Sequence, residues 1–117
     1  TPMNLQQLKA SGGIVDGNCV KKVVQWTHLD PAGDSITDAV TVHVRRQSFG
    51  VIEQLFASDG SEQSRNARYI AASVRLGQDA DEALSYEDAY SLEPGLGFLL
   101  LNAVNEVNGT GGAGTKN

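Results

Sequence analysis

The sequence predicts a small α+β domain, in which an antiparallel sheet carries its helices packed on one face. Three observations support this prediction: residues 20–46 contain two alternating strands around a turn-rich segment, residues 49–57 have helical spacing, and residues 94–108 form a longer apolar helix. The chain has 117 residues, of which 40% are hydrophobic. We therefore expect one folded domain with a modest core.

The sheet is predicted from a β-hairpin over residues 20–46, whose arms flank a segment of Asp, Pro, Gly and Ser. Alternation places the apolar side chains of both arms on one buried face: Val20, Val24, Trp26, Val40, Val42 and Val44. We expect Val24 to pair with Val42 and Trp26 to lie opposite Val40. A slip of two residues would preserve this facing, whereas a slip of one would bury charge.

Short helices are expected on both sides of the hairpin. Residues 4–10 form the first, which the Ser-Gly-Gly sequence ends, and residues 14–19 are a loop. After the hairpin, Ser48 is expected to cap a helix that runs to about Ala57. This helix presents four apolar side chains to the core: Phe49, Ile52, Leu55 and Phe56.

Residues 65–76, which follow a polar loop at residues 58–64, fit either a helix or a strand. We expect a strand, because residues 77–81 resemble a turn and residues 83–85 are placed to return beside it. Ser85 then caps a short helix to Leu92, with Glu87 and Asp88 in the first turn, where the helix dipole favours acids.

The terminal helix begins at Pro94, which suits a first turn, and a C′ glycine at Gly109 ends it. One apolar stripe has helical spacing: Leu96, Leu100, Ala103, Val104 and Val107. Phe98, Leu99 and Leu101 lie off this stripe. A helix that is apolar on more than one side is either deeply buried or shared with a partner, so these three residues are the candidate partner-binding residues.

The ends of the chain are expected to lie outside the domain. Residues 1–2 precede the methionine that we take as the natural start, and are expected to be a tag remnant. Residues 3–108 form a single globular domain, and the glycine-rich residues 109–117 are expected to be a flexible tail.

Composition excludes several classes of partner. The net charge of −5 argues against nucleic acid as the main ligand. Five arginines form the one basic group, for which a charged rim is favoured over a nucleic-acid face: Arg45, Arg46, Arg65, Arg68 and Arg75. Residues 76–117 contain half of the acidic residues and only one of nine Lys and Arg. This asymmetry fits either weak head-to-tail self-association or a solvated acidic face. No segment is long and apolar enough to predict a membrane span.

No catalytic, metal or cofactor site is predicted. His28 and His43 fall on opposite faces of the hairpin and cannot chelate one metal together. The single cysteine, Cys19, forms no internal disulfide, fits a reducing cytosol and has no histidine base beside it in sequence. The acidic residues at 79–82 lack the further ligands of a calcium loop, and the glycine pairs lack the context of a nucleotide loop.

Several segments, in this order, resemble the tail assembly chaperones of long-tailed, lambda-like bacteriophages. The resemblance spans nearly the whole chain and rests on the order of the segments, the length and the ending. It is carried by residues 3–13, a hairpin with Trp26, Val42–Ser48, Arg65–Val74, Leu84–Ala89 and Leu101–Gly109.

The resemblance implies a non-enzymatic escort of the tape measure protein, the long helical chain that sets tail length. Such a protein keeps its client soluble in the host bacterial cytoplasm, helps recruit tail tube subunits and is absent from the mature virion. The family often has a second, longer form made by a programmed frameshift, and Lys116-Asn117 is compatible with a slippery AAA-AAC codon pair. The alternative is a structural tail completion or tube-associated protein, which purified virions would contain.

Overall fold

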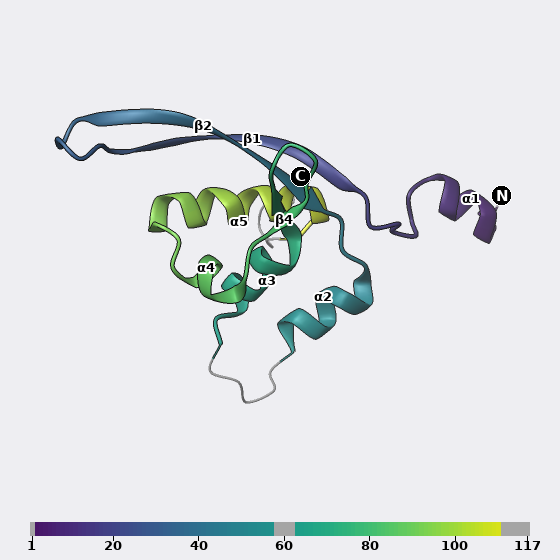
Figure 1. Cartoon of the computed structure of the whole chain (residues 1–117). Coiled ribbons are helices and arrows are strands. Elements are labelled where there is room, and N and C mark those ends of the chain that lie inside the picture. The colour runs from purple at the N-terminus through teal and green to yellow at the C-terminus, as the bar shows by residue number, and fades with distance from the viewer. Residues whose placement is uncertain (1, 58–62, 111–117) are drawn as a thin grey trace.

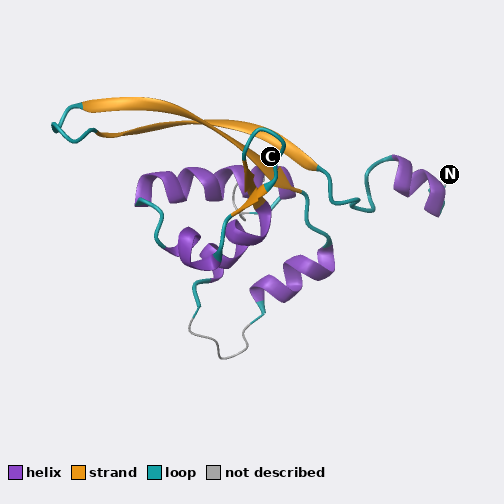
Figure 2. Ribbon diagram, in the orientation of Figure 1, coloured by secondary structure: helices purple, strands orange, loops and turns teal. Residues whose placement is uncertain are grey.

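The computed structural model of the chain describes residues 2–57 and 63–110. The molecule is elongated, 62 × 34 × 31 Å, with a sheet lying over a layer of helices (Figure 1). The residues before the first strand, 2–18, form an N-terminal arm that projects from one end. The elements are α1 (Leu5–Ala10), β1 (Cys19–Leu29), β2 (Ser35–Arg45), α2 (Phe49–Phe56), α3 (Arg65–Ser73), β3 (Val74–Leu76), β4 (Glu82–Ala83), α4 (Tyr86–Tyr90) and α5 (Pro94–Asn108). The predicted α+β class, with the helices on one face of the sheet, is confirmed (Figure 2). Most of the predicted tail, residues 111–117, lies outside the described residues.

The sheet has the order β1-β2-β3-β4, with every neighbouring pair antiparallel. The predicted hairpin is confirmed, but its predicted register is wrong by two residues, because Val24 pairs with Val40 and Trp26 with Asp38. The cause is the turn, where one carboxylate oxygen of Asp30 accepts the amides of Ala32 and Asp34, both at 2.9 Å. Hairpin turn geometry fixes register, and a shift of two leaves every side chain on its predicted face.

The hairpin is much longer than the rest of the sheet. β3 pairs with only two residues of β2, His43 and Val44. The outer half of the ribbon therefore has no further strand beside it and extends past the helices (Figure 2). Burial follows the same division: Val42 and Val44 are fully buried, whereas Val24 and Val40 are only partly covered at the edge of the core.

The predicted strand over residues 65–76 is wrong for its first nine residues, which form α3. The Ser64 hydroxyl accepts the amide of Ala67 at 3.2 Å and caps the helix. Helical spacing then buries Ile70 and Ser73 on one side. The strand prediction holds for β3, and the predicted turn after it leads to β4.

Helix α2 is capped by Ser48 as predicted, but its predicted core face is only partly correct. Ile52, Leu55 and Phe56 pack against the core, whereas Phe49 is 79% exposed. Phe49 is the first residue of the helix, beyond the edge of α3. Phe56 meets the ring of Tyr69 edge-on, with ring centroids 5.1 Å apart.

The core lies between the sheet and helices α3 and α5. The predicted stripe of α5 is confirmed: Leu100, Ala103 and Val104 are buried, and Leu96 and Val107 pack beside them. Gly109 ends the helix in the left-handed conformation, with φ of 67°. The last helical residue, Asn108, accepts the amide of Gln47 at 2.6 Å and donates to the carbonyl of Arg45 at 3.3 Å. These bonds fasten the C-terminal end of α5 to the end of β2.

Replacing Val42 with Asp should destabilise the domain by roughly 3 kcal/mol or more, because it buries an unpaired charge. Thr41→Asp is the matched control, because the neighbouring side chain is exposed on the opposite face of the same strand. Urea unfolding of the two variants measures the difference. Equal stability of Val42→Asp and the unmodified protein would contradict the packing of the hairpin on the core.

Candidate partner-binding surface

Helices α3, α4 and α5 surround an apolar hollow of about 280 Å³. Each helix contributes apolar side chains to its wall, among them Ala67, Ile70, Ala89, Tyr90, Phe98 and Leu101. Ala67, Ile70 and Ala89 at the floor of the hollow are buried in the core. The aromatic rings of Tyr90 and Phe98 at its rim are each 66% exposed. Large exposed apolar side chains around a concave floor are typical of a surface that receives another molecule.

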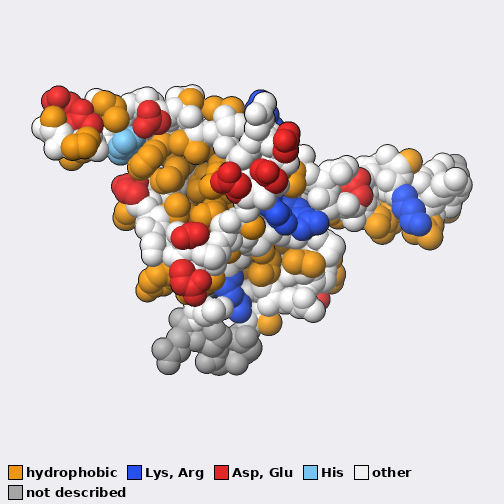
Figure 3. Space-filling view, viewed as in Figure 1, with side chains coloured by type: hydrophobic (Ala, Val, Ile, Leu, Met, Phe, Trp, Pro, Cys, Tyr) orange, Lys and Arg blue, Asp and Glu red, His pale blue; other side chains and the backbone are white. Residues whose placement is uncertain are grey.

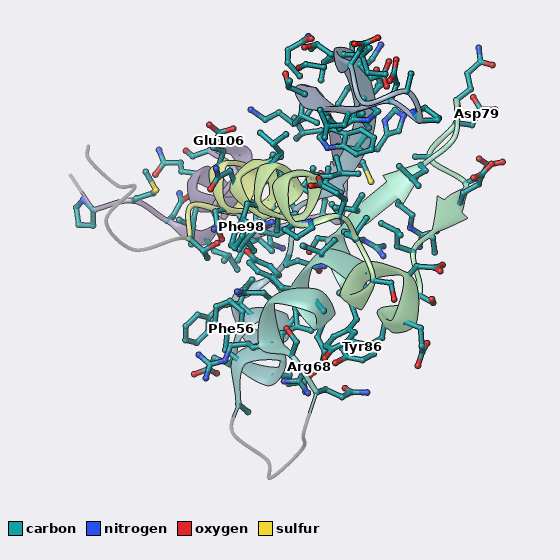
Figure 4. The ribbon with its side chains drawn as sticks, turned by 90° about the vertical axis from the view of Figure 1, so that its left-hand side faces the viewer. Phe56, Arg68, Asp79, Tyr86, Phe98 and Glu106 are labelled. Atoms are coloured by element: carbon teal, nitrogen blue, oxygen red, sulfur yellow. The ribbon has the colours of Figure 1, made fainter. Side chains whose placement is uncertain are left out.

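The structure brings together two of the three predicted partner-binding residues. Phe98 and Leu101 both line the hollow, and Leu101 also packs against the core. Leu99 is half-buried and lies on another flank of α5, the flank that carries Glu106. Figure 4 shows Glu106 toward the hairpin and Phe98 toward the other helices. The hollow therefore uses Phe98 and Leu101 without Leu99.

Sequence reasoning missed the contribution of α4 to this surface. Tyr90 stands at the rim of the hollow, and its ring lies 5.8 Å from that of Tyr86 in a tilted contact. The available signal was a pair of tyrosines one helical turn apart in an otherwise acidic helix. The Tyr86 hydroxyl is used structurally, because it accepts the amide of Ser64 at 2.8 Å.

A second surface lies under the outer half of the hairpin, where polar groups link the ribbon to α5. The Trp26 indole donates to a carboxylate oxygen of Glu93 at 2.9 Å, and the same oxygen accepts the Leu96 amide at 2.9 Å. The Trp26 ring stacks on His28 with centroids 3.8 Å apart. His28 Nε2 in turn lies 2.7 Å from a carboxylate oxygen of Asp38. We call Trp26, His28, Asp38 and Glu93 the hairpin clip.

The clip shifts the protonation of two of its members. The hydrogen bond to Asp38 is the main cause that raises the pKa of His28, and the negative charges of Asp38 and Glu93 add to it. The bond from the Leu96 amide, followed by the bond from Trp26, lowers the pKa of Glu93. Both shifts favour the charged forms, so at a pH below the raised pKa of His28 the clip holds an imidazolium beside the carboxylates of Asp38 and Glu93.

Other charged residues connect elements and form no single patch. Lys22 pairs with Glu106 at 3.2 Å and adds a second link between the hairpin and α5. Arg46 donates to the carbonyl of Gly12 at 3.3 Å, and Arg65 lies over the ring of Phe56 at 5.7 Å. The predicted basic group is therefore dispersed: Arg46 lies at the base of the arm, Arg65 at the contact of α2 with α3, and Arg75 in β3.

The histidines lie on opposite faces of the hairpin, as predicted. His28 shares the face of Trp26, whereas His43 pairs with Lys21 and Arg75 on the other. Within residues 2–57 and 63–110, no group of His, Cys, Asp and Glu side chains is arranged to hold a metal ion. Over the same residues, no helix has both the length and the apolar character to cross a membrane.

Apolar side chains also gather between the hairpin and the helices (Figure 3). Together with the hollow, this distribution indicates a protein whose chemistry is contact with other proteins. A family model described as phage tail assembly chaperone, TAC, matches residues 6–108. The chain belongs to the phage tail assembly chaperone family, a class of assembly proteins and not of enzymes. No curated protein and no solved structure matches it significantly.

The fluorescence of Trp26, the only tryptophan in the chain, should report the protonation of His28. A protonated imidazole quenches a stacked indole, so emission should increase as the pH rises through a pKa above the ordinary 6.5. Because that pKa is raised, the His28–Asp38 contribution to stability is complete below 6.5 and is lost as the pH rises through the raised value.

The titration should vanish in His28→Gln and persist in His43→Gln, because His28 stacks on the indole whereas His43 lies on the opposite face of the hairpin. An unchanged emission transition in His28→Gln would show that another group controls the indole.

Proposed function

We propose that this chaperone binds an apolar, helical stretch of the tape measure protein, keeps it soluble in the host cytoplasm and helps recruit tail tube subunits around it. The observation that carries the proposal is the hollow between α3, α4 and α5 with its exposed aromatic rim. Membership of the tail assembly chaperone family supports the general role. On this proposal the protein leaves before the virion is complete.

The geometry of the hollow suits a helical client. An amphipathic helix inserts side chains from one face, spaced three or four residues apart, into an apolar groove. The floor of the hollow is apolar and already packed on the core, so it needs little rearrangement to receive them. Phe98 and Tyr90 project beyond the floor and supply side walls for the inserted helix. Burying these two rings removes apolar surface from water and favours binding.

Leu99 has a different position in this proposal. It lies on the hairpin flank of α5, next to the apolar region under the ribbon, and does not line the hollow. A long client that crosses α5 would touch both flanks. Phe98 and Leu101 are then the primary contact, and Leu99 belongs to an extension of it toward the hairpin.

Two further features accompany this proposal. Weak self-association would cover the apolar surface while no client is bound. A longer, frameshifted form would carry additional sequence beyond Asn117, a position outside the described residues. Peptides in a phage lysate that contain Lys116-Asn117 and continue in the −1 reading frame would demonstrate that form.

Co-expression with the tape measure protein tests the proposed function. The client should remain in the soluble fraction with the unmodified chaperone and should precipitate without it. Phe98→Asp should abolish this rescue without unfolding the protein, because the ring is 66% exposed and the new charge opposes an apolar client. Leu99→Asp should reduce the rescue by a smaller factor.

Asn102→Asp is the matched control, because it adds the same charge to an exposed position of α5 outside the hollow. Full rescue by a folded Phe98→Asp protein would place the client elsewhere. Failure of the unmodified chain to rescue, together with its presence in purified virions, would instead favour a tail completion or tube-associated protein.

A further inference from the structure

The N-terminal arm contains a fully formed helix that has no buried residue against the rest of the described chain. The side chain of Asn4 accepts the Gln7 amide at 2.8 Å, and the side chain of Gln7 accepts the Asn4 amide at 3.0 Å. This reciprocal capping box defines the start of α1. No residue of the helix is buried, and the arm projects from the end of the domain (Figure 1).

One side of the arm is apolar and open to solvent. Met3 is 59% exposed, Leu5 is 61% exposed and Leu8 is 39% exposed. Apolar side chains are visible along the arm in Figure 3. A helix of six residues is far shorter than the roughly 12–15 that an isolated helix needs for marginal stability in water. The capped, apolar α1 is therefore expected to persist only when another surface covers it.

The arm projects away from the helices that form the hollow of its own chain (Figure 1). Arg46 anchors the base of the arm through two hydrogen bonds. Its backbone amide donates to the carbonyl of Asn18 at 3.1 Å, and its side chain donates to the carbonyl of Gly12 at 3.3 Å. This anchor adjoins the C-terminal end of α5, whereas Phe98 lies about 15 Å away along the helix. With α1 intact, Leu5 lies only about 10 Å from Gly12.

We propose that α1 of one copy docks into the hollow between α3, α4 and α5 of a second copy. The two surfaces are complementary in shape, because a short apolar ridge meets an apolar depression of about 280 Å³. They are also complementary in charge. Lys9, one turn beyond Leu5, is the only charged residue between 2 and 15. Helix α4 carries Glu87 and Asp88, and α5 is capped by Glu93.

This contact is heterologous, because the arm and the hollow are different surfaces of the molecule. Each copy offers one arm and one hollow, so the contact builds either a closed ring, of which reciprocal arm exchange between two copies is the smallest, or an open chain of copies. The contact also has a regulatory consequence, which rests on the proposed function: the arm of a neighbour and the client compete for the same hollow. Self-association then protects the apolar surface until a client displaces the arm.

Analytical ultracentrifugation of the full chain tests the docking without any client. The unmodified protein should increase in average mass with concentration. Leu5→Asp, which disables the arm, and Phe98→Asp, which disables the hollow, should each remain monomeric. Gln6→Asp is the matched control, because it adds the same charge to the adjacent exposed residue off the apolar side, and it should associate normally.

Mixing the two disabled variants gives the decisive result. Phe98→Asp retains an intact arm and Leu5→Asp an intact hollow, so the equimolar mixture should form a heterodimer and stop there, with up to about a twofold rise in average mass. A mixture that remains monomeric, or a Leu5→Asp protein that associates like the unmodified chain, would overturn the docking. Solubility of the co-expressed client is a separate measurement. If neither the unmodified protein nor Leu5→Asp keeps the client soluble, the proposed function is contradicted, while the mixing result still tests the docking.

Discussion

Burial of the valine row at the base of the hairpin is the interaction on which the other elements depend. Val42 and Val44 are fully buried in the same core cluster as Leu100 and Val104 of α5. Each fully buried valine contributes about 1.5–3 kcal/mol. This contact fixes which face of the ribbon is inside, and it holds α5 in the position where α3 and α4 can pack beside it. The hollow between α3, α4 and α5 depends on this contact, because the core-facing side of α5 fixes the position of the helix.

The outer half of the hairpin lacks this support, and polar links replace it. β3 ends its pairing at His43, so the ribbon beyond has neither a third strand nor a complete core beneath it. The clip from Trp26 to Glu93 connects this part of the ribbon to α5 instead, and the ion pair from Lys22, opposite Val42, to Glu106 lies nearer the base. Such exposed links contribute less than apolar burial and respond to pH and salt. The base of the hairpin is thus held by apolar burial, whereas its outer half is held by polar contacts that depend on pH and salt.

Local patterns predicted most elements, and the errors have physical causes. Alternation predicted the faces of the hairpin, but only the hydrogen bonds of Asp30 within the turn fix its register. The preference for a strand at residues 65–73 overlooked Ser64 as a helix cap, a signal that was present in the preceding polar segment. The hydrogen bond from the Gln47 amide to the Asn108 side chain joins positions 61 residues apart, and no local pattern predicts it.

The candidate site shows the same limit more sharply. Excess apolar character in α5 correctly drew attention to this helix, but periodicity along one helix cannot tell which flank another helix covers. Leu101 became a wall of the hollow because α3 and α4 pack on its side, and Tyr90 joined it from an acidic helix. Leu99 lies on the flank of α5 that carries Glu106, and Glu106 pairs with Lys22 of the hairpin. A binding surface assembled from three helices is a property of their packing, and the sequence of any one helix specifies only its own contribution.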